Sequence, residues 1–243
     1  MRRAQGPDVD LSVYAKAVPL LVRNPAIVVV PVLMAVVGVL LQLTMITSYG
    51  GGAMGSLTGQ LATFIAILLE LFGLGAACIM ADDAWRHGRA SFEKGWTEAR
   101  NRGGEILFAS LGFTLLLAVA QYAGSLIGPF AIALIVVVVV FLIWAIPAAA
   151  VGGVPGGAAI QVSIDRVRGA PLPAVIAAIV TVALLALGVP ILSVYLSSVI
   201  PVLHASLIAN LLVGALVQGI AVGYVALILA KTYADTAFGT RRW

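Results

Sequence analysis

The sequence predicts an all-α integral membrane protein, built as a six-transmembrane-helix bundle. Of its 243 residues, 62% are hydrophobic and 10% are charged, whereas soluble domains have about 45–50% apolar and about 25% charged residues. Six apolar runs are each long enough to cross a bilayer core about 30 Å thick, which takes roughly 20 residues of helix. All 14 lysines and arginines lie outside these runs. This composition excludes a water-soluble enzyme, a disordered chain and a disulfide scaffold.

The apolar runs define the expected spans in chain order. Each must be helical because hydrocarbon offers no partner to an unpaired backbone group. The runs also lack the alternation that is typical of transmembrane barrel strands. We therefore treat 1–243 as a single transmembrane domain, with spans at about 26–47, 61–80, 106–126, 130–151, 173–200 and 205–229.

The distribution of basic residues predicts the topology. Every Lys and Arg lies in the N-terminal segment, the second-to-third connection, the fourth-to-fifth connection or the tail, and the other three connections carry none. Cytoplasmic connections are enriched in Lys and Arg. Six spans with both termini in the cytoplasm place all 14 cations on one side.

Three cytoplasmic segments share one design. A short candidate helix at about 11–22, 91–99 and 158–167 is followed each time by a basic residue, a Gly or Pro break and an outward span. This pattern suggests three repeats of interfacial helix plus transmembrane hairpin. Amphipathic helices of this kind lie in the headgroup plane with their apolar side down. The alternative is that they cap the inner ends of the spans.

The basic face predicts contact with lipid. Anionic headgroups are attracted by about 1 kcal/mol per cation near the surface. Aromatic residues are not interleaved with these cations as they are in nucleic-acid surfaces, so we expect a lipid bilayer and no nucleic acid as partner. The candidate headgroup contacts are Arg23, Arg100, Arg102, Arg166 and Arg168.

Glu70 is the only acidic residue well inside an expected span. An intramembrane carboxylate is costly and is by default a candidate functional group, such as a proton or cation relay or a contact to a polar substrate. The alternative is a protonated structural acid that hydrogen-bonds a neighbouring helix. Asn210 and Gln218 in the last span could bond between helices or line a cavity.

Two further patterns concern the last two spans. Pro190 cannot donate a hydrogen bond to the carbonyl of Ala186, so a helix kink is expected near Gly188 and Pro190. A transporter could use the freed carbonyl at its substrate site, but packing adaptation is the simpler interpretation. In the sixth span, Ala215, Gly219 and Gly223 recur at four-residue spacing. Such a stripe allows close helix packing, within the bundle or between copies.

No motif for catalysis or cofactor binding is found. Asp82, Asp83 and His87 lie close in sequence, but alone they form a weak metal motif and are interpreted as a charged cap. His204 is expected on the opposite side of the membrane from His87. The sequence contains no P-loop, paired-cysteine motif or G-x-S-x-G. We therefore expect no catalytic residues, no metal and no cofactor.

Several segments resemble a known bacterial group. Leu20-Leu21-Val22-Arg23-Asn24-Pro25 precedes the first span, and Pro147 closes the fourth. The Gly152–Gly157 turn then leads to Ala159-Ile160-Gln161-Val162-Ser163, ahead of the fifth span. This layout resembles the bacterial six-span proteins related to the membrane domain of glycerophosphoryl diester phosphodiesterases, a Yip-family-like group. The resemblance implies a bacterial inner-membrane location. Phosphodiesterase chemistry belongs to a separate soluble domain, so no catalytic residue is carried over.

Two functions remain open from the sequence. The first is a non-enzymatic membrane protein that organises lipid or a membrane complex, alone or as a homo-oligomer. The second is a small transporter or channel that uses Glu70 and the Pro190 helix break. A lipid-modifying enzyme would need a nucleophile and base or a metal set, and the sequence shows neither.

Overall fold

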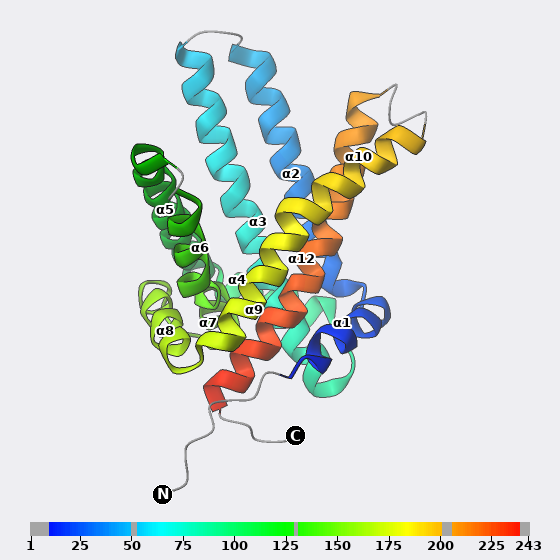
Figure 1. Ribbon diagram of the computed structural model, residues 1–243. Helices are drawn as coiled ribbons and strands as arrows, with labels where there is room; N and C mark the ends of the chain where they lie inside the picture. Colours follow the sequence, from blue (N-terminus) through cyan, green and yellow to red (C-terminus); the bar gives the residue numbers. More distant parts are fainter. Residues whose placement is uncertain (1–9, 50–52, 129–130, 201–205, 239–243) are drawn as a thin grey trace, which may run out of the picture.

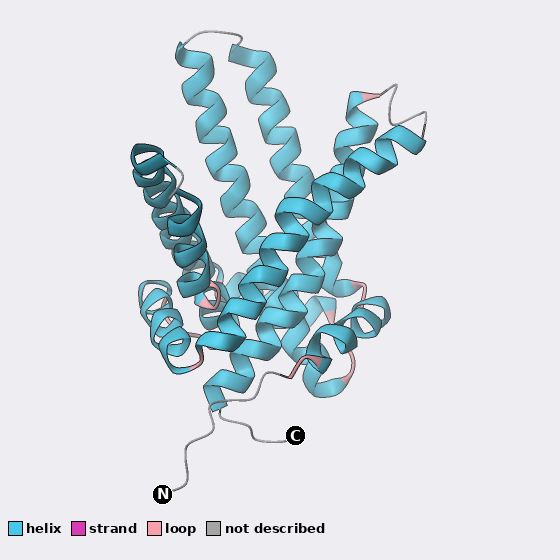
Figure 2. Ribbon diagram, in the orientation of Figure 1, coloured by secondary structure: helices cyan, strands magenta, loops and turns pink. Residues whose placement is uncertain are grey.

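The computed structural model describes residues 10–49, 53–128, 131–200 and 206–238. Within these ranges the regular elements are helices and there is no strand (Figure 2). Six helical stretches are long and apolar enough to span a membrane, which confirms the predicted class and span count. They are Ala26–Thr44, Thr58–His87, Gly103–Gly124, Ile132–Ala150, Pro171–Val199 and Leu207–Thr236.

The long helices extend beyond the apolar runs that predicted them. α2 covers Ala26–Tyr49, α5 covers Gly103–Ile127 and α12 covers Leu207–Phe238. α3 covers Ala53–His87, well past the predicted 61–80. At its C-terminal end the helix continues through charged residues, because carboxylates and cations four residues apart pair along its surface.

The fourth span is not one continuous helix, as the apolar run 130–151 suggested. α6 covers Ala131–Leu142 and α7 covers Ala145–Ala150. Pro147 explains the break, because it lacks an N–H and its ring crowds the carbonyl four residues earlier. The buried Ser163 hydroxyl bridges the gap: it accepts from the Trp144 N–H at 3.1 Å and donates to the Phe141 carbonyl at 2.8 Å.

The fifth span contains a π-helical segment. α9 covers Pro171–Val182, a π-helix η2 follows at Ala183–Gly188, and α10 covers Val189–Val199. The Val189 N–H donates to the carbonyl of Leu184, five residues earlier. This wider turn lies directly before Pro190, where an ordinary α-helical hydrogen bond is impossible.

Three short helices lie at one end of the bundle. They are α1 (Ser12–Arg23), α4 (Phe92–Asn101) and α8 (Gly156–Gly169), close to the predicted segments. Figure 1 shows them at the same end as α7 and the C-terminal end of α12. We call this the charged end. Each short helix directly precedes a span, in the order that the threefold plan predicts.

The helical hairpins diverge from the charged end. In Figure 1 the hairpin α2–α3, the hairpin α5–α6 and the last two spans, α9–α10 and α12, lie together at that end and separate toward the other. The largest fully buried side chains include Trp144, Tyr233 and Met80, all near the charged end. Val119 and Val194, farther out, are 64% and 68% exposed. The core of the protein therefore lies on the charged side.

The small residues of α12 lie against α2. A Cβ added at Gly219 would stand 2.7 Å from the Val32 Cα and N, and one at Gly223 would stand 3.0 Å from Val28 Cγ2. Ala215 is buried. The stripe therefore lets two transmembrane backbones approach closely inside one chain.

Replacing Ser163 with alanine tests the bridge across the fourth span. The Trp144 N–H would lose its acceptor in a buried site, so Ser163→Ala should lower the free energy of unfolding by about 1–3 kcal/mol. The measurement is unfolding in mixed micelles of increasing denaturing-detergent content.

Ser197→Ala is the matched control, because the exposed Ser197 hydroxyl only donates to the Val194 carbonyl of its own helix. It should change the free energy by less than about 0.5 kcal/mol. Equal effects of the two substitutions would contradict the bridging role of Ser163.

Candidate functional site

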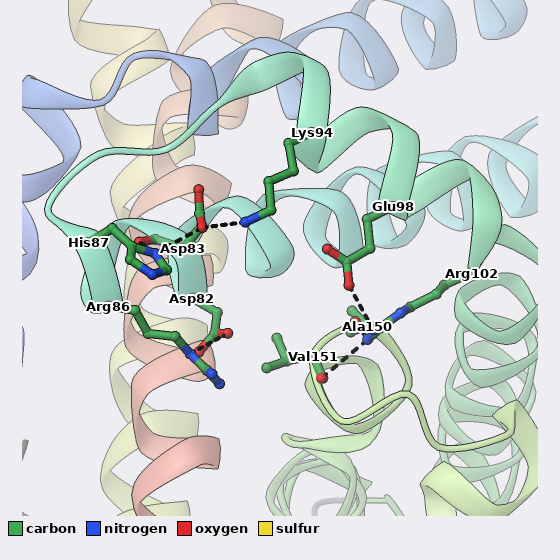
Figure 3. Close-up of polar contacts among 9 residues, drawn as sticks. All are labelled: Asp82, Asp83, Arg86, His87, Lys94, Glu98, Arg102, Ala150 and Val151. Atoms are coloured by element: carbon green, nitrogen blue, oxygen red, sulfur yellow. Dashed lines mark hydrogen bonds and ion pairs between the residues drawn. The ribbon is translucent and has the colours of Figure 1, made fainter.

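The most polar part of the described structure is a group of side chains from α3 and α4, at the charged end. Figure 3 shows them facing a shared space beside the end of α7. They line a cavity of about 320 Å³, together with the Ala150–Val151 backbone. We call this set the charged cluster: Asp82, Asp83, Arg86, His87, Lys94, Glu98 and Arg102.

The α3 side of the charged cluster is built from pairs one helical turn apart. Arg86 Nε lies 2.9 Å from Asp82 Oδ2, and His87 Nδ1 lies 3.1 Å from Asp83 Oδ1. Lys94 of α4 donates to the same Asp83 oxygen at 3.0 Å. This hydrogen bond and the Asp83 charge raise the pKa of Lys94 above its usual value. Asp83 therefore ties α4 to the end of α3.

Ser91 explains why α4 begins where it does. Its side chain accepts a hydrogen bond from the Lys94 N–H at 3.4 Å, as an N-cap serine does. The cap fixes the start of the helix that carries Lys94 and Glu98 into the charged cluster.

Arg102 joins the charged cluster to the broken fourth span. Its Nη2 lies 2.7 Å from Glu98 Oε1, while Nη1 donates to the carbonyls of Ala150 at 2.6 Å and Val151 at 3.2 Å. These carbonyls close the C-terminal end of α7, where a helix leaves acceptors unpaired and carries partial negative charge. A planar guanidinium suits several such acceptors at once.

Glu105 holds the other side of the same turn. Its Oε2 accepts from the Gly156 N–H at 2.6 Å, at the N-terminal end of α8. A carboxylate is favoured there because the first helical N–H groups have no internal partner. Between the two helices, Gly153 has a φ of 62°, which glycine adopts readily. The predicted Gly152–Gly157 turn is therefore held by a cation at its start and an anion at its end.

The five arginines predicted to contact lipid headgroups lie in two settings. Arg23, Arg100 and Arg168 are exposed, and Arg168 lies 3.8 Å from Asp165. Arg102 is held by the protein as described. Arg166 donates to the Tyr233 carbonyl at 3.0 Å and lies over the Tyr233 ring, and burial lowers the pKa of its guanidinium. Only the first three are exposed, so that a headgroup can reach them.

The intramembrane candidates are only partly brought together. Gln218 of α12 donates to Glu70 Oε2 of α3 at 3.5 Å, and both side chains are half-buried. Asn210 is half-buried as well, but no hydrogen bond joins its side chain to either of them in the described structure. Glu70 lines neither the cavity of the charged cluster nor the apolar groove beside η2. His204 lies outside the described residues.

Asn24 is a structural residue that sequence analysis did not single out for a role. It is 3% exposed, and its Oδ1 accepts from the Ala90 N–H at 2.7 Å. Its Nδ2 donates to the carbonyls of Leu20 at 2.9 Å and Gly88 at 3.4 Å. The Asn24-Pro25 pair predicted a break between helices. Its distant partners at the α3–α4 connection could not be read from that pair.

The chemistry available at the charged cluster is electrostatic. Three carboxylates face three permanent cations, and the side chains that line the cavity include no Ser, Thr or Cys. Among the described residues no group of three or more His, Cys, Asp or Glu side chains is arranged to hold a metal ion. The cluster therefore offers fixed, balanced charges that hold α3, α4 and α7 together.

Removing the Arg102 guanidinium should destabilise the protein. Arg102→Gln leaves the α7 carbonyls and Glu98 without their charged partner, and we expect the free energy of unfolding to fall by about 1.5–3 kcal/mol. Arg102→Lys should recover only part of the lost stability, because an ammonium group cannot reach several acceptors at once as the planar guanidinium does. Unfolding in mixed micelles measures both.

Arg100→Gln is the control, since Arg100 is exposed on the neighbouring helix. An equal loss with Arg100→Gln and Arg102→Gln would show that net charge, and not the capping contact, matters.

Adding a methyl group at Gly156 tests the close contact between α8 and α5. The new Cβ would lie 2.5 Å from Phe108 Cβ and 2.6 Å from the Glu105 carbonyl oxygen. Because backbone must then shift, Gly156→Ala should cost about 1–3 kcal/mol of stability.

At the adjacent Gly157 a Cβ meets nothing within 4 Å. Gly157→Ala should leave stability unchanged or raise it by up to about 1 kcal/mol, because alanine is the better helix former. A thermal melt followed by circular dichroism compares the two variants. A stable Gly156→Ala variant would refute the contact.

Comparison with known proteins adds no family assignment. No family model, curated protein or solved structure matches the chain. The resemblance to the phosphodiesterase membrane-domain group stays a prediction from the residues quoted for it.

Proposed function

We propose that this chain is a non-enzymatic, bacterial inner-membrane protein that organises lipid or a membrane complex around its charged end. The observation that carries the proposal is the divergence of the hairpins from that end (Figure 1). Within the fifth span only 11% of the most apolar stretch is buried inside the chain. Most of its side-chain surface must therefore meet lipid or another protein.

The distribution of charge supports an orientation with the charged end in the cytoplasm. Every described Lys and Arg lies on α1, α4 or α8, in the α3–α4 connection, at the adjoining ends of α3 and α5, or in the last turns of α12. Cytoplasmic segments are enriched in these residues. With Arg102 and Arg166 held by the protein, the exposed Arg23, Arg100 and Arg168 are the groups that would attract anionic headgroups.

Extraction from the native membrane in a mild detergent tests this function. We expect defined anionic lipids or protein partners to remain bound, several-fold enriched over the bulk extract when measured by mass spectrometry. The triple substitution of Arg23, Arg100 and Arg168 by glutamine should lower the lipid enrichment, because it removes three exposed cations of the charged end.

Glu93→Gln with Asp165→Asn is the matched control, since it alters exposed charges of α4 and α8 in the opposite sense. It should not lower lipid retention. A clean, lipid-free monomer would overturn the proposed function.

A small transporter or channel is a second candidate, favoured by the contact between Glu70 and Gln218. A carboxyl group inside a membrane span is by default a candidate for a proton or cation relay, and here it contacts an amide from a second span. If the protein has this function, it should conduct protons when it is reconstituted in liposomes. A pH-sensitive dye trapped inside the liposomes measures the proton flux.

Glu70→Gln should then abolish the proton flux, because an amide cannot release a proton. Glu93→Gln, at the exposed surface of α4, should leave the flux intact. Unchanged flux in Glu70→Gln would remove Glu70 from any transport mechanism and leave it as a structural acid.

A further inference from the structure

An apolar groove lies between α1, the π-helical part of the fifth span and α12. It has a volume of about 620 Å³, within the range of small-molecule sites in proteins. Its walls come from three elements and are almost wholly aliphatic. Val22 of α1, Leu184, Gly188 and Leu192 of the fifth span, and Val217 and Tyr224 of α12 line it.

The fifth span forms one wall, and its π-helix shapes that wall. The wider turn of η2 ends at Gly188, which has no side chain. A Cβ placed there would meet only atoms of the same span, Leu184 Cδ1 at 3.4 Å and the Ala183 carbonyl oxygen at 3.7 Å. The glycine therefore leaves space toward α1 and α12 that a larger residue would fill.

The groove offers hydrocarbon but almost no hydrogen-bonding group to an occupant. The one polar side chain in its lining is Tyr224, whose hydroxyl already donates to the Tyr14 carbonyl at 3.0 Å. Leu184 to Leu192 and Val217 to Tyr224 all lie within candidate membrane spans. An occupant must therefore be apolar along the whole groove.

The residues of α1, which forms one wall of the groove, divide among three faces of the helix. Val13 and Ala17 are buried against the protein. Val18 and Val22, at the groove, are apolar yet 54% and 77% exposed. At about 100° per residue, the exposed Lys16 and Arg23 lie on a third face.

This division is the one expected of a helix in the membrane interface. One face packs on protein, one meets acyl chains and one carries cations at the level of the headgroups. Lys16 and Arg23 then lie on the aqueous side of the helix that forms this wall of the groove, and a negatively charged headgroup complements them.

We propose that the groove binds one acyl chain of an anionic phospholipid, whose headgroup lies at Lys16 and Arg23. The inference rests on the proposed lipid-organising function and names the lipid class and the place where it binds. A helix from a second copy of the chain is the competing occupant, and the experiment separates the two.

The test uses the full chain in nanodiscs that contain phosphatidylglycerol with a photoreactive diazirine on one acyl chain. After irradiation, mass spectrometry measures the lipid adducts on each peptide. We expect adducts on 184–192 and 217–224 to be several-fold more frequent than on 115–119 of α5, which is also exposed and apolar. The matching phosphatidylcholine probe should show a smaller excess.

Variants then locate the site. Gly188→Phe fills the groove and should remove the excess of adducts. Leu192→Trp, at a position 45% exposed, should also fill the groove and remove the excess. It does not add a side chain to the π-helix itself. Val119→Trp on α5 is the control and should leave the excess intact. Lys16→Gln with Arg23→Gln should abolish the preference for phosphatidylglycerol.

Adducts in the groove that are no more frequent than on the other exposed apolar faces would overturn the inference. This is the result expected if a helix from a second copy fills the groove and excludes lipid. If native lipids are retained but the groove shows no excess of adducts, only this site fails and the lipid-organising function stands. If no lipid or partner is retained at all, the proposed function fails first.

Discussion

Hydrocarbon supplies no hydrogen-bonding partner, so each interruption of a transmembrane helix in this chain has to be satisfied by protein. The described structure meets this constraint in two ways. At the fourth span, Ser163 of α8 bridges the gap between Phe141 and Trp144. This gap lies at the charged end, within reach of α8. At the fifth span the chain widens its own turn, and Val189 reaches back to Leu184. The first of these brings α8 against the fourth span. The second places the π-helix in one wall of the apolar groove.

The charged end works as a set of caps and ties between helices. Arg102 holds the carbonyls that end α7, and Glu105 holds the N–H group that begins α8, although both residues come from the start of one span. Asn24 ties the start of α2 to the α3–α4 connection, and Lys94 ties α4 to α3. Polar side chains at this end therefore add specific ties between helices to the apolar core that lies there. Toward the other end the hairpins separate (Figure 1).

The class, the six spans and the three short helices could be predicted because they depend on composition and local pattern. Hydropathy alone identifies a span, and Ser91 marks a helix start whatever surrounds it. What the sequence could not give depends on distant partners. Ser163 is an ordinary helix residue until α8 brings it beside Trp144, and Glu105 is an ordinary first-turn acid until Gly156 meets it. Gln218 was predicted to bond between helices or to line a cavity, but its partner, Glu70, comes from a span far away in the chain and could not be named. The π-helix shows the same limit: Pro190 predicts an irregularity, not its form.

The bridge at Ser163 also has a consequence for biogenesis. The hydroxyl that completes the fourth span lies 19 residues after Trp144 and 22 residues after Phe141. A ribosome therefore finishes α6 and α7 before it has made the residue that satisfies the backbone between them. During synthesis that gap has to be hydrated or held by the insertion machinery until α8 emerges. The second hairpin can thus be completed only after the segment behind it has been translated.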